Sequence, residues 1–252
     1  MKKNFTFAML LMSMCLFTAC SSDNDDEVLP PYDSSSISRK LCGGWYRQQN
    51  NMTTDILFWD NGKMYYRLTN HAGPSSDYSW NYNDNTGILA TTAGYQGTNE
   101  YLNLQWEVTL VDSTAWTGIM LYGNKGTQKF SRASSLFEAR TVLNARTWVN
   151  TKDHSEWTPE PRNNYFRMSN GKVDINIIPD YYVRVDESIA QDKIFIREFS
   201  TSSASKNNDL SKVIYECIID HPYSYNNVRV SCKWVSNYGD GYHSDLYLKP
   251  KN

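Results

Sequence analysis

The 252-residue chain lacks the common sequence motifs of catalysis and of metal binding. It has no glycine-rich phosphate loop, no CxxC pair and no HExxH motif, each of which would indicate a defined chemistry. Its four histidines are scattered over predicted loops: His71, His154, His221 and His243. Carboxylates such as Glu187 fall on predicted outer faces, without the spacing that places two across a substrate in a glycosidase. The sequence therefore favours a protein that is not an enzyme and that needs no cofactor or metal.

An excess of basic residues is also missing. The formal charge is −2, from 25 Lys and Arg against 27 Asp and Glu. Removal of an N-terminal signal with Lys2 and Lys3 would leave −4, and the next segment carries five carboxylates, so the rest of the chain is near +1. A nucleic-acid-binding protein would instead carry a clustered basic face. We expect no nucleic-acid partner.

Long apolar runs are rare as well. The longest extends from Phe5 to Phe17, which is too short for a bilayer-spanning helix of about 20 residues. Two lysines precede this run, and Thr18-Ala19-Cys20 follow it. Residues 1–19 therefore resemble a bacterial lipoprotein signal peptide. The resemblance implies cleavage before Cys20 and lipidation of that cysteine, with palmitate among its acyl chains. Two chains anchor a protein stably in a membrane. Cleavage after Ala19 without lipidation is the alternative.

Residues 20–36 are polar, acidic and proline-containing. Such a segment cannot bury apolar area, and we expect a disordered tether. Its acidic cluster, Asp23 to Glu27, resembles the export signal of Bacteroidetes surface lipoproteins, which implies an outer-membrane protein that faces the cell exterior. A merely solvated spacer is the alternative.

Aromatic residues are plentiful, with 18 Tyr, 8 Trp and 9 Phe, and they favour β-structure. Tyr78, Trp80 and Tyr82 alternate with polar residues, which predicts a strand with one packed face. Such an aromatic stripe could hold a ligand, but the filling of a barrel is its more ordinary role. We expect first-half strands near 45–50, 55–59, 63–69, 78–83, 88–92, 101–110, 115–122 and 127–131, and second-half strands near 147–151, 165–169, 172–178, 181–186, 193–199, 212–220, 228–235 and 245–249.

The two halves resemble each other. Asn61-Gly62-Lys63 recurs 109 residues later as Asn170-Gly171-Lys172, and a repeat is the economical explanation. Asn-Gly between alternating runs is a strong hairpin signal, with positive φ expected at both turn residues. The second half contains an insertion, visible as residues 152–164. Between the halves, Ser135 and Glu138 form a predicted capping box that starts a short helix, with Leu136, Ala139 and Leu143 on its packed face.

Eight sequential antiparallel strands close into a small barrel. The spacing of Leu41, Gly43, Trp45, Phe58 and Gly62, continued by Tyr78, Trp80, Trp106 and Val108, resembles the lipocalin-like domains of Bacteroidetes lipoproteins. This resemblance implies an up-and-down barrel at the cell envelope. The second half departs from it, since Ala145 and Arg146 stand where the family has glycine. We therefore predict an all-β protein with a first barrel at 37–132, a linker helix at 133–146 and a second barrel at 147–252.

Five cysteines are present. Cys15 leaves with the signal and Cys20 carries the lipid, so that Cys42, Cys217 and Cys232 remain. Cys217 and Cys232 lie on the apolar faces of neighbouring predicted strands, where opposed residues are close enough for a disulfide. We predict that bond, with Cys42 free. Two packed thiols are the alternative.

The long connections of the second half suggest a binding surface. Its first, fifth and seventh connections are long and share one barrel end, and loops on a rigid scaffold commonly bind ligands. We expect Trp157, Tyr238, Tyr242 and His243 as the contacts, with Trp157 partly exposed in a loop. The predicted function is non-catalytic binding of a glycan or a small amphipathic molecule. A structural or protein-binding subunit of an envelope assembly is the alternative, which exposed sheet edges would favour.

Overall fold

The computed structural model describes residues 36–49, 52–68, 78–94, 101–122, 125–235 and 245–251. The predicted signal peptide, Cys20 and nearly all of the tether lie outside these ranges, as do Tyr238, Tyr242 and His243. Within the described ranges, no helix has the length and apolar character that a bilayer crossing requires.

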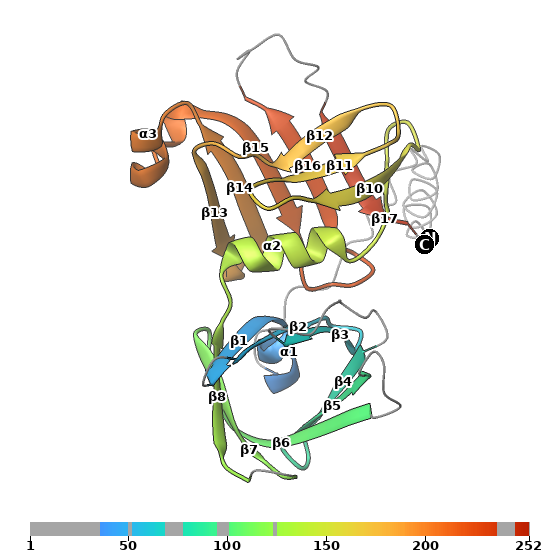
Figure 1. The fold of residues 1–252 in the computed structure, drawn as a ribbon, viewed down its shortest axis with the longest axis vertical. Helices are drawn as coiled ribbons and strands as arrows, with labels where there is room; N and C mark the ends of the chain where they lie inside the picture. Colours follow the sequence, from blue (N-terminus) through green and yellow to red (C-terminus); the bar gives the residue numbers. More distant parts are fainter. Residues whose placement is uncertain are drawn as a thin grey trace, which may run out of the picture. The chain divides into compact units, whose positions relative to one another are not determined.

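The first half is a closed eight-stranded barrel (Figure 1). A short helix, α1 (Ile37–Leu41), precedes it. Each strand pairs antiparallel with the next, and β1 returns to β8 through Trp45 opposite Arg132. The predicted up-and-down barrel is confirmed. Its strands are β1 (Gly43–Gln49), β2 (Met52–Phe58), β3 (Lys63–Leu68), β4 (Tyr78–Asn83), β5 (Ile88–Gly94), β6 (Tyr101–Val111), β7 (Ala115–Met120) and β8 (Thr127–Arg132).

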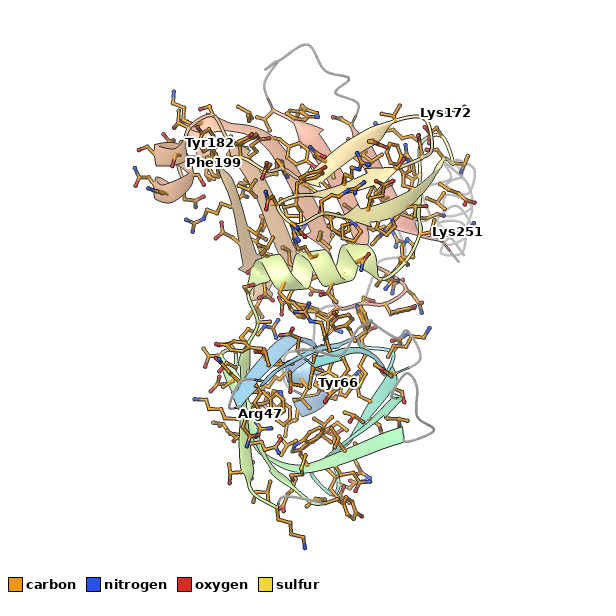
Figure 2. All side chains as sticks on the ribbon, in the orientation of Figure 1. Arg47, Tyr66, Lys172, Tyr182, Phe199 and Lys251 are labelled. Carbon is orange, nitrogen blue, oxygen red and sulfur yellow. The ribbon has the colours of Figure 1, made fainter. Side chains whose placement is uncertain are left out.

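Aromatic side chains fill the interior of this barrel. Along β4, Tyr78, Trp80 and Tyr82 are buried while the residues between them are exposed. Trp116 stacks on Phe130 with ring centroids 4.2 Å apart, and Trp106 packs edge-on against both. Arg47 also lies over the Phe130 ring, and Tyr66 packs against Tyr78; Figure 2 labels Arg47 and Tyr66. The aromatic stripe is therefore core, as its alternation predicts.

The second half is a nine-stranded antiparallel sheet that nearly closes (Figure 1). Strand β9 pairs with both β10 and β17, whereas β12 and β13 form the two ends of the sheet. Its elements are α2 (Ser135–Asn144), β9 (Trp148–Asn150), β10 (Glu156–Pro161), β11 (Phe166–Ser169), β12 (Asp174–Ile178), β13 (Val183–Ser188), η1 (Ile189–Gln191), β14 (Lys193–Phe199), α3 (Ser202–Asn207), η2 (Leu210–Lys212), β15 (Val213–Asp220), β16 (Arg229–Trp234) and β17 (Leu246–Pro250).

The prediction of eight strands in this half was wrong by one, because the insertion at 152–164 contains β10. Pro159 and Pro161 made this segment look like a loop, since proline cannot donate to a ladder. Strand β10 tolerates them because its two ends have different partners. Glu156 and Trp157 pair with β9, whereas Thr158 to Pro161 pair with β11 alone. Each proline therefore has a paired strand on one side only.

The two halves nevertheless share an order of elements. With β10 set aside, β9 and β11–β17 follow one another as β1–β8 do, and β17 returns to β9 as β8 returns to β1. Each half also opens alike, because Trp45 and Trp148 each donate the indole N–H to a helix carbonyl, that of Leu41 or Leu143. In both Asn-Gly turns only glycine has positive φ, at 80°. The expectation of positive φ at asparagine was wrong.

Helix α2 begins one residue earlier than the sequence suggests. Ser134 is the N-cap, and its hydroxyl accepts the Phe137 N–H at 3.2 Å. Glu138 does not complete a capping box, because its carboxylate accepts the backbone N–H of Gly44. Leu136 is 41% exposed, whereas Ala139 and Leu143 are buried. Two of the three residues predicted on the packed face are therefore buried and Leu136 is not, and the helix also directs an acidic side chain, that of Glu138, into the interior.

Candidate functional site

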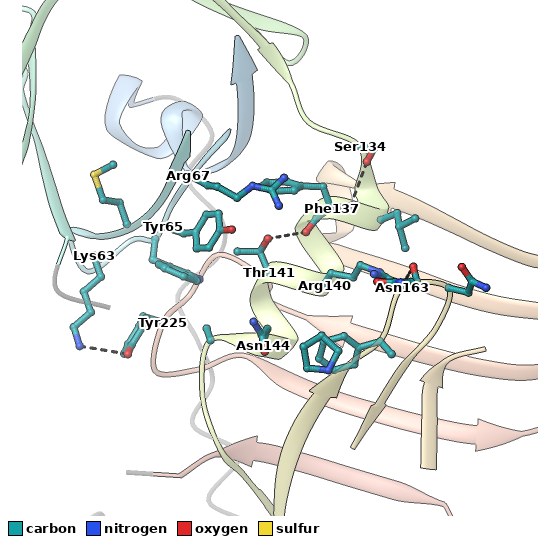
Figure 3. A pocket seen from close by; sticks show the side chains of 17 residues that line it. Lys63, Tyr65, Arg67, Ser134, Phe137, Arg140, Thr141, Asn144, Asn163 and Tyr225 are labelled. Atoms are coloured by element: carbon teal, nitrogen blue, oxygen red, sulfur yellow. Dashed lines mark hydrogen bonds between the residues drawn. The ribbon is translucent and has the colours of Figure 1, made fainter. Parts of the chain in front are cut away.

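A cleft of about 620 Å³ lies between β3 of the first barrel and helix α2 (Figure 3). Strands β10 and β11 line its other side, and Tyr225 from the β15–β16 connection completes it. Ligand sites commonly enclose about 300–1,000 Å³, so the cleft has the size of a small-molecule or oligosaccharide site.

Alternation along β3 directs side chains toward this cleft. Tyr66 faces the barrel interior with Tyr78, so the period of two places Lys63, Tyr65 and Arg67 on the outer face. Tyr65 meets Phe137 of α2 edge-to-face, with ring centroids 6.1 Å apart. One wall of the cleft is therefore an aromatic pair contributed by two separate elements (Figure 3).

A second aromatic pair consists of Trp59 and Tyr225, whose ring centroids are 5.5 Å apart. The Tyr225 N–H is held by Asp60 at 3.0 Å, which fixes the connection against the first barrel. Lys63 lies 4.4 Å from the centre of the Tyr225 ring and donates to its hydroxyl at 3.3 Å. The indole N–H of Trp59 is buried and has no hydrogen-bond partner among the described residues.

The cleft carries positive charge. Its lining includes Lys63, Arg67 and Arg140, and none of its described lining residues is Asp or Glu. Arg67 is neutralised by Asp55, with its Nε 2.9 Å from Oδ2. Arg140 instead donates to the carbonyls of Arg162 and Asn163, at 3.1 and 3.5 Å. The site therefore offers more hydrogen-bond donors than acceptors.

Behind the cleft, a buried network joins the first barrel to the second half. Glu138 is fully buried, and its Oε1 accepts the Gly44 N–H at 2.5 Å. Arg132 of β8 lies 3.2 Å from Glu138 and 2.7 Å from Glu187 of β13. The Tyr223 hydroxyl lies 2.5 Å from both carboxylates. The prediction that Glu187 lies on an outer face was therefore wrong.

The number of protons available to the Tyr223 hydroxyl indicates which carboxyl group of this network is protonated. The Tyr223 hydroxyl has one proton to donate and also accepts from Arg132 at 2.9 Å. It can donate to only one of the two carboxylates, so the other must be a carboxylic acid that donates to Tyr223. Burial raises the pKa of Glu138 to about 8, against the lowering effect of Arg132. Glu138 is therefore the protonated partner at neutral pH.

This pair of carboxylates has no access for a substrate, because Glu138 is 0% and Tyr223 4% exposed. A glycosidase pair must flank an open cleft. Elsewhere, His221 lies 2.8 Å from Asp192, beside a turn outside the cleft. Among the described residues, no cluster of three metal-ligating side chains occurs.

The structure places only one of the predicted ligand contacts. Trp157 lies in β10 opposite Trp148, is 4% exposed, and donates its indole N–H to Ser155 at 2.8 Å. The expectation of a partly exposed loop tryptophan was therefore wrong. The other predicted contacts, Tyr238, Tyr242 and His243, lie outside the described ranges, so their role stays a prediction.

The predicted pairing of cysteines has the expected register. Cys217 and Cys232 are directly opposed on β15 and β16, both buried, with their sulfurs 2.8 Å apart. No bond joins the two sulfurs in the structure, in which Cys42 is also free. Burial raises the pKa of Cys42 to about 12, which makes this thiol unreactive. The disulfide itself stays a prediction.

The sequence analysis missed the cleft and the network beneath it. Both depend on side chains that are far apart in the chain, such as Tyr65 with Phe137 and Gly44 with Glu138. One signal was present, since Glu138 stands among apolar positions of a short helix. An acidic residue there requires a buried partner.

No protein-family model matches the chain, and comparisons with curated proteins and with solved structures give no match. The geometry of the site and the sequence patterns therefore carry the functional argument.

Proposed function

We propose that the protein is a non-catalytic binding lipoprotein of the outer membrane, and that it holds a glycan or a small amphipathic molecule in the cleft between β3 and α2. The observation that carries the proposal is the lining of the cleft, where two aromatic pairs stand beside cationic and amide side chains. Tyrosine and tryptophan provide an apolar face and a polar group together, which suits sugar rings and amphipathic molecules.

The sequence supports the cellular context. The segment before Cys20 has the pattern of a lipoprotein signal, and the acidic residues after it have the pattern of a surface-export signal. Lipidation at Cys20 would attach the binding unit to the membrane through a flexible tether. Such an arrangement suits the capture of a ligand outside the cell.

Titration of the purified protein tests this function. The panel contains neutral and acidic oligosaccharides and carboxylated amphiphiles, and binding is followed by tryptophan fluorescence and calorimetry. We expect Tyr65→Ala to weaken binding roughly 3- to 10-fold, because an aromatic contact is worth about 0.5–1.5 kcal/mol. Tyr65→Phe, which keeps the ring, and Tyr122→Ala, whose side chain is 63% exposed outside the cleft, serve as controls. Absence of binding to every member of the panel would refute the proposal.

A second candidate function is protein binding. Strands β12 and β13 form the ends of the second sheet and pair with one strand each. Between them, Tyr181 and Tyr182 are 68% and 47% exposed. An edge strand can accept a strand from a partner. This function predicts that a bound partner protects the amides of Val183–Ser188 from hydrogen exchange.

A further inference from the structure

The cleft between β3 and α2 is lined by three cationic side chains, and their positive charge is only partly neutralised by neighbouring carboxylates. Lys63 contacts the Tyr225 ring and hydroxyl, and no ion pair is found for it in the described part of the chain. Arg140 contacts two backbone carbonyls. Neither contact supplies a negative charge. Arg67 alone among the three lining cations has a carboxylate partner.

Other half-buried arginines of this chain pair their guanidinium groups with carboxylates. Arg132, Arg167 and Arg197 all lie within 3.2 Å of a carboxylate. Arg140 differs because no carboxylate pairs with it in the described part of the chain, and its printed partners are backbone carbonyls alone. A half-buried cation without a counter-charge is costly. An anion in the cleft would supply the negative charge that Arg140 lacks.

Arg146 adds to the positive potential beside this cleft. It follows α2 directly, lies 3.9 Å from the centre of the Tyr225 ring, and donates to the Tyr225 carbonyl. Its Nε and Nη2 are buried without partners among the described residues. Burial lowers the pKa of Arg146, yet an arginine stays charged at neutral pH. Arg140 in α2 and Arg146 just after it thus both favour an anion nearby.

The remaining polar groups in the cleft match an acceptor-rich molecule. The Trp59 indole N–H lacks a partner and lies in the lining. Asn144, Asn163 and Asn164 add amide groups on the α2 side. The aromatic pairs offer ring faces, which suit the C–H faces of sugars better than a compact inorganic ion.

We propose that the ligand of this cleft is an anionic saccharide, with its acidic groups bound by Arg140 and by Lys63 and a sugar ring against Tyr65 and Phe137. This inference rests on the proposed binding function and narrows it to one class of ligand. Charge-assisted hydrogen bonds from arginine are about twice as strong as neutral ones, and the planar guanidinium recognises carboxylates and other oxyanions with two parallel bonds.

The test compares ligands that differ only in charge. A galacturonic acid trisaccharide and its methyl ester share their rings, and a sulfated disaccharide and its unsulfated form make the second pair. We expect the charged member of at least one pair to bind roughly 10- to 100-fold more tightly than its neutral counterpart. The pair that shows the difference identifies the carboxylate or the sulfate as the recognised group. The affinity should also fall as the salt concentration rises.

Variants assign the effect to the cleft. Arg140→Gln and Lys63→Gln should each lower the preference for the charged ligand, and the double variant should remove most of it, whereas Arg140→Lys should keep the contribution of Arg140 in part. Lys172→Gln is the matched control, because Lys172 is exposed in the β11–β12 turn away from the cleft (Figure 2). Melting temperatures identify any variant that has lost stability instead of a ligand contact.

The outcomes separate the two proposals. Equal binding of charged and neutral ligands, weakened by Tyr65→Ala, would overturn the anionic preference and leave the binding function standing. A charge preference that survives both Arg140→Gln and Lys63→Gln would overturn the assignment to this cleft. Binding of neither pair nor of any other panel member would overturn the binding function itself.

Discussion

Replacement of Glu138 by glutamine should abolish a pH dependence of stability that the wild-type protein carries. Burial raises the pKa of Glu138 from its ordinary value of 4.5 to about 8. Glutamine has the shape of the protonated acid, so its carbonyl can still accept the Gly44 N–H and its amide can donate to Tyr223. The substitution therefore removes the ionisation with little change in packing.

The sign follows from proton linkage. Between pH 4.5 and 8, the folded protein keeps a proton on Glu138 that the unfolded chain has released. The stabilisation is therefore fully present below about pH 4.5 and is lost as the pH rises through 8. At roughly 1.4 kcal/mol per pKa unit, the whole change is at most about 5 kcal/mol. The network also contains Arg132, Glu187 and Tyr223, which remain in the variant.

Urea unfolding at several pH values, followed by tryptophan fluorescence, measures this effect. We expect wild type to lose several kcal/mol between pH 5 and 9, while Glu138→Gln changes little over the same range and is the more stable protein at pH 9. Glu156→Gln, at an exposed carboxylate paired with Lys251, is the control and should follow wild type. Equal stability of wild type at pH 5 and 9, or an unchanged pH dependence in Glu138→Gln, would refute the assignment of the proton to Glu138.

Three further predictions concern the tryptophan of β10, the cysteine pair and the lipid anchor. Trp157→Ala should lower the free energy of unfolding by about 3–5 kcal/mol, because the side chain is buried; an unchanged melting temperature would contradict this packing role. Protein isolated from the oxidising envelope should contain one alkylatable thiol after denaturation, that of Cys42, and three after reduction; three thiols without reduction would exclude the Cys217–Cys232 disulfide. Cys20→Ala should move the protein from the membrane fraction to the soluble fraction, and retention in the membrane would rule out the anchor. Protease treatment of intact cells tests surface exposure of the wild type.

Much of the first barrel is predictable from the sequence because its signals are local. Alternation with a period of two identifies β4 and its inward residues, and the Asn61-Gly62 turn fixes the β2–β3 hairpin. The second half is harder, since its extra strand contains Pro159 and Pro161. Their tolerance depends on which neighbours β10 has along its length, which is a property of the assembled sheet.

The glycines at the start of the first barrel connect the sequence motif to the buried network. Gly43 has φ of 123°, and a Cβ there would overlap the Arg132 guanidinium. A Cβ on Gly44 would lie 2.6 Å from Cγ of Glu138. Both glycines therefore make room for the contact between Arg132 and Glu138 that joins β8 to α2. We expect alanine at Gly44 to destabilise the protein by displacing Glu138.

The second half lacks these glycines for a related physical reason. Arg146 and Thr147 precede Trp148 where Gly43 and Gly44 precede Trp45. Arg146 lies there instead, with its guanidinium 3.9 Å from the centre of the Tyr225 ring and 5.8 Å from that of Trp148. The first half thus buries an acid at its opening, whereas the second half buries a base beside the cleft. This difference places a positive charge beside the cleft, against the ring of Tyr225 in its lining.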